Sequence, residues 1–356
     1  MKNLMICFAF FLCLALPQPA QAQRLVSGQV TDVEDNGIEG VRIDGKLTCI
    51  APTFGTVTFT DSKQTGADGK YTLIFNAAPS GSGCMNPTVS AVASKPGYAF
   101  GATSSSLIVI NFIGIELPQF FSVSAADYRA FTASEMIASG FADSLATTIE
   151  SATSVPLPTT LAGRSVLVKD KNGVEKSAQL FFVSPNQINY IIPPGLAEGI
   201  AVVKVRDGAR LVRAGFIEIQ RVAPSIFTVT SDGKGIPSAF VQRHKQDGAS
   251  VYEPIARFDP SLNAFVAIPI DLGPETDQVF LGLLGTGWRN RSSLQAVTAR
   301  IGGTPVEALY AGLQPTLPGV DQINLRLPRS LAGRGEVEVE IVVDDRTANT
   351  VKINIK

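Results

Sequence analysis

The sequence offers few side chains that could act as catalytic bases. Its single histidine, His244, lies between Arg243 and Lys245 beside a polar turn. One histidine could belong to a histidine-based triad, but alone it cannot form a zinc site that needs several histidines. The simpler interpretation is a solvated turn residue. The sequence also has no GxSxG, GxxxxGK(S/T) or HExxH motif.

Carboxylates are more plentiful, with 31 Asp and Glu residues in total. A glycoside hydrolase needs two of them at a defined separation, which only the folded chain can show. A calcium site needs about six to eight oxygen ligands, and Asp32, Glu34, Asp35 and Asp61 are candidates. These acids are also typical of solvated turns, which is the interpretation we prefer. We therefore expect no metal, no cofactor and no enzymatic activity, with a hydrolase as the less favoured alternative.

Aromatic side chains are the main candidates for contact with a ligand. Trp288, the only tryptophan, ends a Gly-Thr-Gly-Trp turn at residues 285–288. An exposed indole could stack on a sugar or anchor a protein partner, whereas a buried one would fill the core beneath the loops. Tyr252 and Phe258 are weaker candidates for the same ligand contact.

The cysteines bear on the compartment in which the protein works. Cys7 and Cys13 lie in the N-terminal apolar segment, so a processed chain would keep only Cys49 and Cys84. In an oxidising compartment two thiols suggest one disulfide. Two buried free thiols are the alternative, because sequence alone does not give the Cα separation that a disulfide requires.

The N-terminus has the pattern of a secretory signal peptide. Lys2 precedes an apolar run from Leu4 to Leu16, and Ala20-Gln21-Ala22 is a small-residue cleavage site. The apolar run is shorter than the roughly 20 residues that a membrane-spanning helix needs. We predict a protein without a membrane span that is secreted and extracellular or at the cell surface, with the periplasm as a further option.

Composition indicates a turn-rich globular chain and excludes one class of partner. Only 17% of the residues are charged, against about 25% in an average protein, while Gly (32) and Pro (22) are abundant. The formal net charge of -1 lacks the broad positive field of a nucleic-acid-binding protein. We expect the partner to be an extracellular protein or a glycan whose identity the sequence does not give.

These side chains must be positioned by β-strands, because the clearest pattern in the chain is a repeated strand. The stretch QINYIIP at residues 187–193 returns as QINLRLP at residues 322–328. In both, apolar residues alternate with polar ones, which is the period of a half-buried strand, and a proline follows. The recurrence predicts duplicated β-domains, called the first and second repeat below.

The N-terminal part carries strands separated by Asp-Asn-Gly and Asp-Gly turns. Its motifs SGQVTD, NGIEGV, GADGKYTL and KPGYAF, within residues 25–118, resemble those of the carboxypeptidase regulatory-like family. This resemblance implies a small prealbumin-like β-sandwich, and the matching positions are turn and core residues without a catalytic role.

A second resemblance covers residues 128–356. The blocks PLPTTLAGRSVLV, LFFVSPNQINYIIP, APSIF, LLGTGW and NTVKINI are similar to the Solibacter-type C-terminal domain of exported acidobacterial proteins, an immunoglobulin-like (IPT/TIG-like) module. The chain departs from that pattern at Ala142-Asp143-Ser144, where a Gly-Thr turn is expected. The resemblance implies a fold and export, and it implies no active-site residues.

Together these patterns predict an all-β protein of three consecutive β-sandwich modules, one prealbumin-like and two immunoglobulin-like, after a signal peptide. The predicted boundaries are 1–22, 23–118, 119–223 and 224–356. Residues 125–150 could form a helix or short strands, and comparison with the second repeat favours strands. We expect a structural, adhesive or interaction role. The alternative is a carbohydrate-binding protein that uses loop aromatics such as Trp288.

Overall fold

The computed structural model describes residues 23–51, 55–76, 84–105 and 108–356. Within these ranges the regular structure is β-strand, and the one helical turn is a 3₁₀ segment, η1 (Arg329–Leu331). The predicted all-β class is therefore confirmed. The predicted signal peptide lies outside the described residues. No helix within them is long and apolar enough to cross a membrane.

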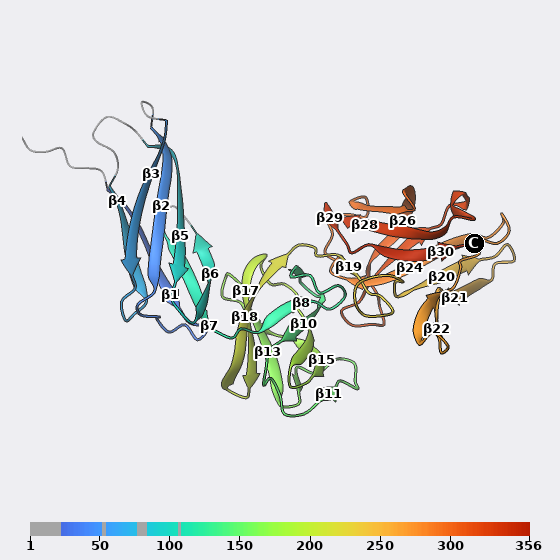
Figure 1. The fold of residues 1–356 in the computed structure, drawn as a ribbon, viewed down its shortest axis with the longest axis horizontal. Coiled ribbons are helices and arrows are strands. Elements are labelled where there is room, and N and C mark those ends of the chain that lie inside the picture. The colour runs from blue at the N-terminus through green and yellow to red at the C-terminus, as the bar shows by residue number, and fades with distance from the viewer. Residues whose placement is uncertain (1–22, 52–54, 77–83, 106–107) are drawn as a thin grey trace, which may run out of the picture. The chain divides into compact units, whose positions relative to one another are not determined.

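The chain divides into two compact units, which we describe separately. Of the described residues, the first contains 23–30, 37–51, 55–76, 84–94, 105 and 108–111, and the second contains 31–36, 95–104 and 112–356. The predicted module boundaries stay predictions, although the strands do fall into successive groups of sheets (Figure 1).

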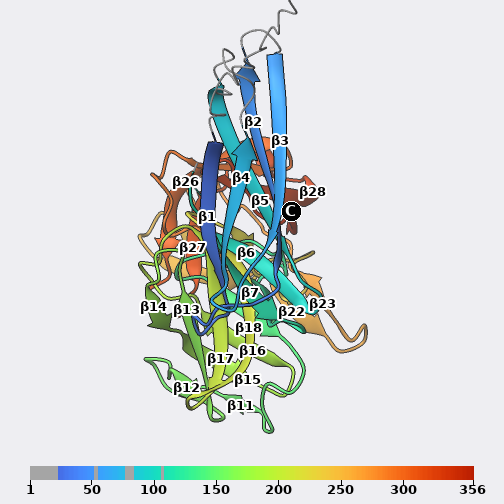
Figure 2. The ribbon, with the colours of Figure 1, turned by 90° about the vertical axis from the view of Figure 1, so that its left-hand side faces the viewer.

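The first group forms two sheets, with the strand orders β4-β1-β7-β6 and β3-β2-β5. Inside the first unit, buried and exposed residues alternate along β2 and β4. Because successive side chains of a strand point to opposite faces, each of these strands turns one face to the core. Figure 2 shows β2, β3 and β4 as long ribbons. The predicted Asp68-Gly69 turn joins β3 to β4, with Gly69 at a positive φ of 74°. These strands are β1 (Gln23–Thr31), β2 (Arg42–Ala51), β3 (Gly55–Gln64), β4 (Lys70–Asn76), β5 (Met85–Ser94), β6 (Tyr98–Ser105) and β7 (Ile110–Glu116).

The first repeat forms a five-stranded sheet, β11-β15-β16-β10-β8, and a second sheet, β12-β13-β17-β18-β9, in which β14 also pairs with β13. Residues 125–150 hold β9, β10 and β11 and no helix, so the preference for strands is confirmed. The bounds are β8 (Phe121–Ser124), β9 (Thr132–Ala133), β10 (Ile137–Phe141), β11 (Glu150–Ser151), β12 (Thr160–Leu161), β13 (Arg164–Lys169), β14 (Glu175–Ser177), β15 (Gln179–Val183), β16 (Gln187–Ile191), β17 (Gly199–Asp207) and β18 (Arg210–Gln220).

The second repeat forms a continuous ten-stranded sheet in the order β21-β20-β24-β27-β26-β25-β28-β29, with β19 on β24 and β30 on β28. The hairpin β22-β23 is a separate two-stranded sheet. The bounds are β19 (Ser225–Ile226), β20 (Ala239–His244), β21 (Ser250–Pro254), β22 (Ala256–Asp259), β23 (Ala264–Ala267), β24 (Gln278–Thr286), β25 (Val297–Ile301), β26 (Thr304–Leu313), β27 (Asp321–Arg326), β28 (Gly335–Val343), β29 (Arg346–Thr347) and β30 (Val351–Ile355).

Strand β26 allows the ten-stranded sheet to enclose a core. Its first residues pair with β25 and its later residues pair with β27, with a bulge between Ala308 and Tyr310. Such a bulge bends a strand and lets it pass from one layer to the next. Residues of both parts, including Leu281, Ile323 and Ile341, are fully buried in one cluster.

The repeated stretch occupies the same place in both repeats. Strand β16 lies between β15 and β10, and β27 lies between β26 and β24. The apolar positions point into the core, and the polar ones form the same bond: Gln187 Nε2 donates to Asn189 Oδ1 at 2.8 Å, and Gln322 Nε2 donates to Asn324 Oδ1 at 2.7 Å. The repeat is therefore a core strand with a polar outer face.

Candidate functional site

Trp288 is fully buried, with 0% of its surface exposed. Its ring packs over Gly285, where a Cβ atom would lie 2.0 Å from the indole Cη2. The Gly-Thr-Gly-Trp turn therefore needs glycine at this position because the indole takes the space of a side chain. This placement matches the interpretation of Trp288 as a core residue, and in this structure the indole is not presented to a ligand.

A buried carboxylate, Asp321, organises the Gly-Thr-Gly-Trp turn. Its Oδ2 accepts hydrogen bonds from the Trp288 N–H at 2.8 Å and the Arg289 N–H at 3.1 Å, and its Oδ1 accepts from Arg289 Nε at 2.6 Å. Burial raises the pKa of Asp321, while Arg289 and these N–H donors act in the opposite direction. A buried charge is tolerated when it is paired and hydrogen-bonded in this way.

The same turn makes contact with the first repeat. The Thr286 hydroxyl donates to the Gly319 carbonyl at 2.8 Å and accepts from the Ile137 N–H at 3.0 Å. Arg289 lies 3.6 Å from the Glu135 carboxylate, and Asn290 Nδ2 donates to the Ser134 carbonyl at 3.1 Å. We call this set of contacts the repeat joint.

Arg129 of the first repeat completes the repeat joint from the other side. Its guanidinium donates to the Pro224 carbonyl at 2.7 Å and to the Thr347 carbonyl at 2.8 Å, and it is paired with Asp127. The sequence did not reveal these partners. The one available signal was the acidic Asp321 at the head of an apolar strand motif, where the first repeat has Asn186.

The sequence-predicted acids are not brought together as a calcium site. Asp32 Oδ1 accepts from the backbone N–H groups of Glu34 and Asn36, which is a turn-capping role. Glu34 pairs with Arg206, and Asp35 pairs with Lys169. Within the described ranges no group of three or more His, Cys, Asp or Glu side chains is arranged to hold a metal.

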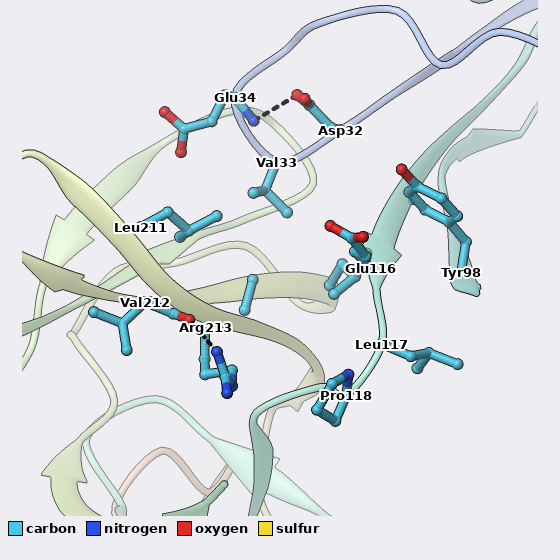
Figure 3. A pocket seen from close by; sticks show the side chains of 13 residues that line it. Asp32, Val33, Glu34, Tyr98, Glu116, Leu117, Pro118, Leu211, Val212 and Arg213 are labelled. Carbon is cyan, nitrogen blue, oxygen red and sulfur yellow. Dashed lines mark hydrogen bonds between the residues drawn. The ribbon is translucent and has the colours of Figure 1, made fainter. Parts of the chain in front are cut away.

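Asp32 and Glu34 also line a hollow of about 300 Å³ in the second unit (Figure 3). Glu116 and Arg213 face the same space, and Tyr98 stands at its side. Of its three acids, Asp32 already caps a turn and Glu34 already pairs with Arg206, so the hollow is a poor setting for an anion or a cation.

His244 lies beside the hairpin turn, but as the half-buried last residue of strand β20 rather than as a solvated turn residue. Its Nδ1 lies 2.8 Å from the Ser250 hydroxyl directly across the hairpin, and its ring meets Phe280 edge-on at 5.3 Å. This is the geometry of an ordinary cross-strand pair.

Tyr252 and Phe258 both lie at the surface, at different places. Tyr252 is 65% exposed on the edge strand β21, where its ring contacts Phe240 at 5.5 Å. Phe258 is 49% exposed on the separate hairpin β22-β23, where it contacts Phe265. The structure thus places the three aromatic candidates in a core, on a sheet and on a hairpin.

Cys49 and Cys84 are joined by a disulfide with a Cα separation of 5.4 Å, so the bridged interpretation holds. Cys49 lies in β2 and Cys84 just precedes β5, the strand that pairs with β2. The bond therefore fastens two neighbouring strands of the three-stranded sheet.

No protein-family model matches the chain, and no curated protein matches it in sequence. A solved structure titled as the S-layer protein SbsC, domains 5-6, is similar at 10% sequence identity. The similarity covers 67% of this chain and 96% of that one, with a TM-score of 0.19. A TM-score this low carries no argument about fold or function.

Proposed function

We propose that the protein is an exported, non-enzymatic β-protein with a structural, adhesive or interaction role outside the cytoplasm. The repeat joint is the observation that carries this proposal. Thr286, Arg289 and Asn290 of the second repeat contact the first repeat. Asp321 holds the turn that carries them through its bonds to Trp288 and Arg289. Residues with these contacts connect the two repeats, which favours a structural role over a catalytic one.

Export is supported by the disulfide together with the signal-peptide pattern. Structural disulfides persist in oxidising compartments and are rare in the cytosol. The Cys49–Cys84 bond therefore fits a protein that folds after export. We also propose, on the motifs quoted above, that the modules belong to the carboxypeptidase regulatory-like and Solibacter-type C-terminal families.

Cell fractionation with a thiol assay tests export directly. The expected result is protein in the extracytoplasmic or surface fraction with no free thiol until a reductant is added. Cytoplasmic accumulation with two free thiols would contradict the proposal. Hydrolysis of any substrate in a broad glycoside and ester panel would contradict its non-enzymatic part.

The structural role can be tested at the repeat joint itself. Thr286→Val removes the hydroxyl that bonds both repeats while keeping the side chain's shape, so we expect faster tryptic cleavage after Arg221, in the segment between the repeats. Thr298→Val, the same change at an exposed position of β25, is the matched control. Equal cleavage of both variants would show that the joint does not couple the repeats.

A further inference from the structure

The outer face of one half of the ten-stranded sheet carries aromatic and amide side chains in register. Residues directly opposite one another on paired strands point to the same side of a sheet. One row across the strands β21, β20, β24, β27 and β26 consists of Tyr252, Gln242, Phe280, Arg326 and Glu307.

The next row across the same strands has the same mixed chemistry. It consists of Pro254, Phe240, Gly282, Asn324 and Tyr310. We call these two rows the aromatic face. The alternate residues of the same strands, such as Val241, Leu281 and Leu325, are buried in the core, so the aromatic face is the outer side of the sheet.

Gly282 shapes the aromatic face. A Cβ at this position would lie 2.4 Å from the Phe240 ring, so the ring lies down over the glycine rather than standing up from the sheet. Beside it, the Phe240 and Tyr252 rings are 5.5 Å apart and tilted by 57°. The Phe240 ring thus lies flat against the sheet, and the more exposed Tyr252 ring lies next to it.

The charges of the aromatic face cancel, which restricts what it can bind. Arg326 and Glu307 are its charged residues, and they lie directly opposite each other on β27 and β26. A face without net charge complements an uncharged ligand and offers no field for a nucleic acid or an anionic lipid. Half-buried rings flanked by amides are suited to pyranose sugars, whose C–H faces pack on rings while their hydroxyls bond to amides.

We infer that the aromatic face binds single chains of a neutral polysaccharide. Tyr252 and Phe280 stand two strands apart in one row, so their backbones are about 10 Å apart, the length of a disaccharide unit. Gln242 lies between them as a hydrogen-bonding group. Since the Phe240 and Tyr252 rings are tilted by 57° rather than coplanar, the face fits a twisted soluble chain better than a flat crystalline surface.

This inference rests on the proposed adhesive role and names the class of its partner. The test is affinity electrophoresis of the full processed chain in gels containing xylan, mannan or mixed-linkage β-glucan, with crystalline cellulose and alginate as further probes. We expect retardation by at least one of the soluble neutral polysaccharides. Retardation by alginate alone, or by no polysaccharide, would overturn the inference.

Two variants and one control locate the binding to the aromatic face. Tyr252→Ala and Gln242→Ala should each weaken retardation at least tenfold. Phe258→Ala removes an aromatic side chain of similar exposure from the separate hairpin and should leave retardation unchanged. Unchanged emission from Trp288 in the second unit would show that each variant is folded. Equal loss in Phe258→Ala, or none in the two face variants, would refute the assignment.

Failure of this inference is distinguishable from failure of the proposed function. If the protein is exported and disulfide-bonded but no polysaccharide retards it, the proposed structural role stands and the inference of glycan binding at the aromatic face is rejected. A chain that stays in the cytoplasm with free thiols loses the proposed function whatever the gels show.

Discussion

At the scale of residues, the surroundings of Asp321, Arg289 and Trp288 decide what these side chains do. Asp321 and Arg289 neutralise one another inside the repeat joint, and the Trp288 indole replaces the missing side chain of Gly285. A residue type that could do chemistry is thus informative only with its surroundings. The same indole would be a ligand contact on a loop and is a core residue here.

Trp288 provides a direct test of its burial. Since the indole is 0% exposed, we expect a blue-shifted emission that iodide and acrylamide quench little until the second unit unfolds. Trp288→Ala should lower the free energy of unfolding by about 3–5 kcal/mol, the usual cost of removing a buried aromatic side chain. Strong quenching in the native protein would show that the indole is accessible.

Two buried tyrosines predict a loss of stability in alkali. Burial raises the pKa of Tyr71 to about 12, and burial also raises the pKa of Tyr190, whose hydroxyl bonds to Ser122. In the unfolded chain both would ionise near pH 10. The unfolded state therefore binds fewer protons between pH 10 and 12, so stability is complete below pH 10 and falls as the pH rises through this window.

Denaturant unfolding at a series of pH values measures this effect. Tyr71→Phe should reduce the slope of stability against pH above pH 10 in the transition of the first unit and leave it flat below. A slope identical to that of the unmodified protein would show that the phenol of Tyr71 is not protected by folding.

At the scale of elements, glycines mark where an aromatic ring crosses a strand. Gly140 lies under Phe120 in the first repeat, as Gly285 lies under Trp288 in the second, and a Cβ at Gly140 would lie 1.9 Å from the Phe120 ring. The equivalent strands β10 and β24 therefore carry glycine for the same reason, although at positions that differ in register.

Gly285→Ala is the corresponding prediction. The new methyl group would lie 2.0 Å from the indole and 2.3 Å from the Ser225 carbonyl oxygen, so β24, β19 or the ring must shift. We expect a cost of about 1–3 kcal/mol, typical of overpacking. Gly66→Ala, where the nearest atom is 3.6 Å away, should change chemical denaturation little. An equally stable Gly285→Ala protein would show that the joint has room to relax.

Local sequence patterns predicted single strands and turns well. The alternation in QINYIIP and the Asp68-Gly69 turn each depend on a few neighbouring residues, so the sequence contains their signal. The passage of β26 between two sheet layers depends on pairing with β25 on one side and β27 on the other. The alternation of residues within β26 does not indicate which strands it pairs with.

The candidate sites were harder to predict for the same reason. The aromatic face joins Tyr252 to Tyr310 through three intervening strands, and the repeat joint connects Glu135 to Arg289 across more than a hundred residues. Tyr252 was identified from its residue type, but its neighbours follow only from strand order. Asp321 was missed because an acid before a strand usually lies in solvent.

At the scale of the whole molecule, two compact units should unfold separately, and the disulfide should act on one of them. Cys49 and Cys84 lie in the first unit, whereas Trp288 lies in the second. Reduction opens a loop spanning 35 residues, which costs about 4 kcal/mol in the chain-entropy model. We therefore expect reductant to lower one of two calorimetric transitions and leave the other, which Trp288 emission follows, unchanged.

The double variant Cys49→Ser/Cys84→Ser separates this effect from other actions of the reductant. It should reproduce the lowered first transition without reductant, and adding reductant should then change nothing further. A single transition that follows both calorimetry and Trp288 emission would mean that the two units unfold as one cooperative body. A lowered second transition would mean that the disulfide stabilises residues beyond its own unit, and either result would reject the independence of the two units.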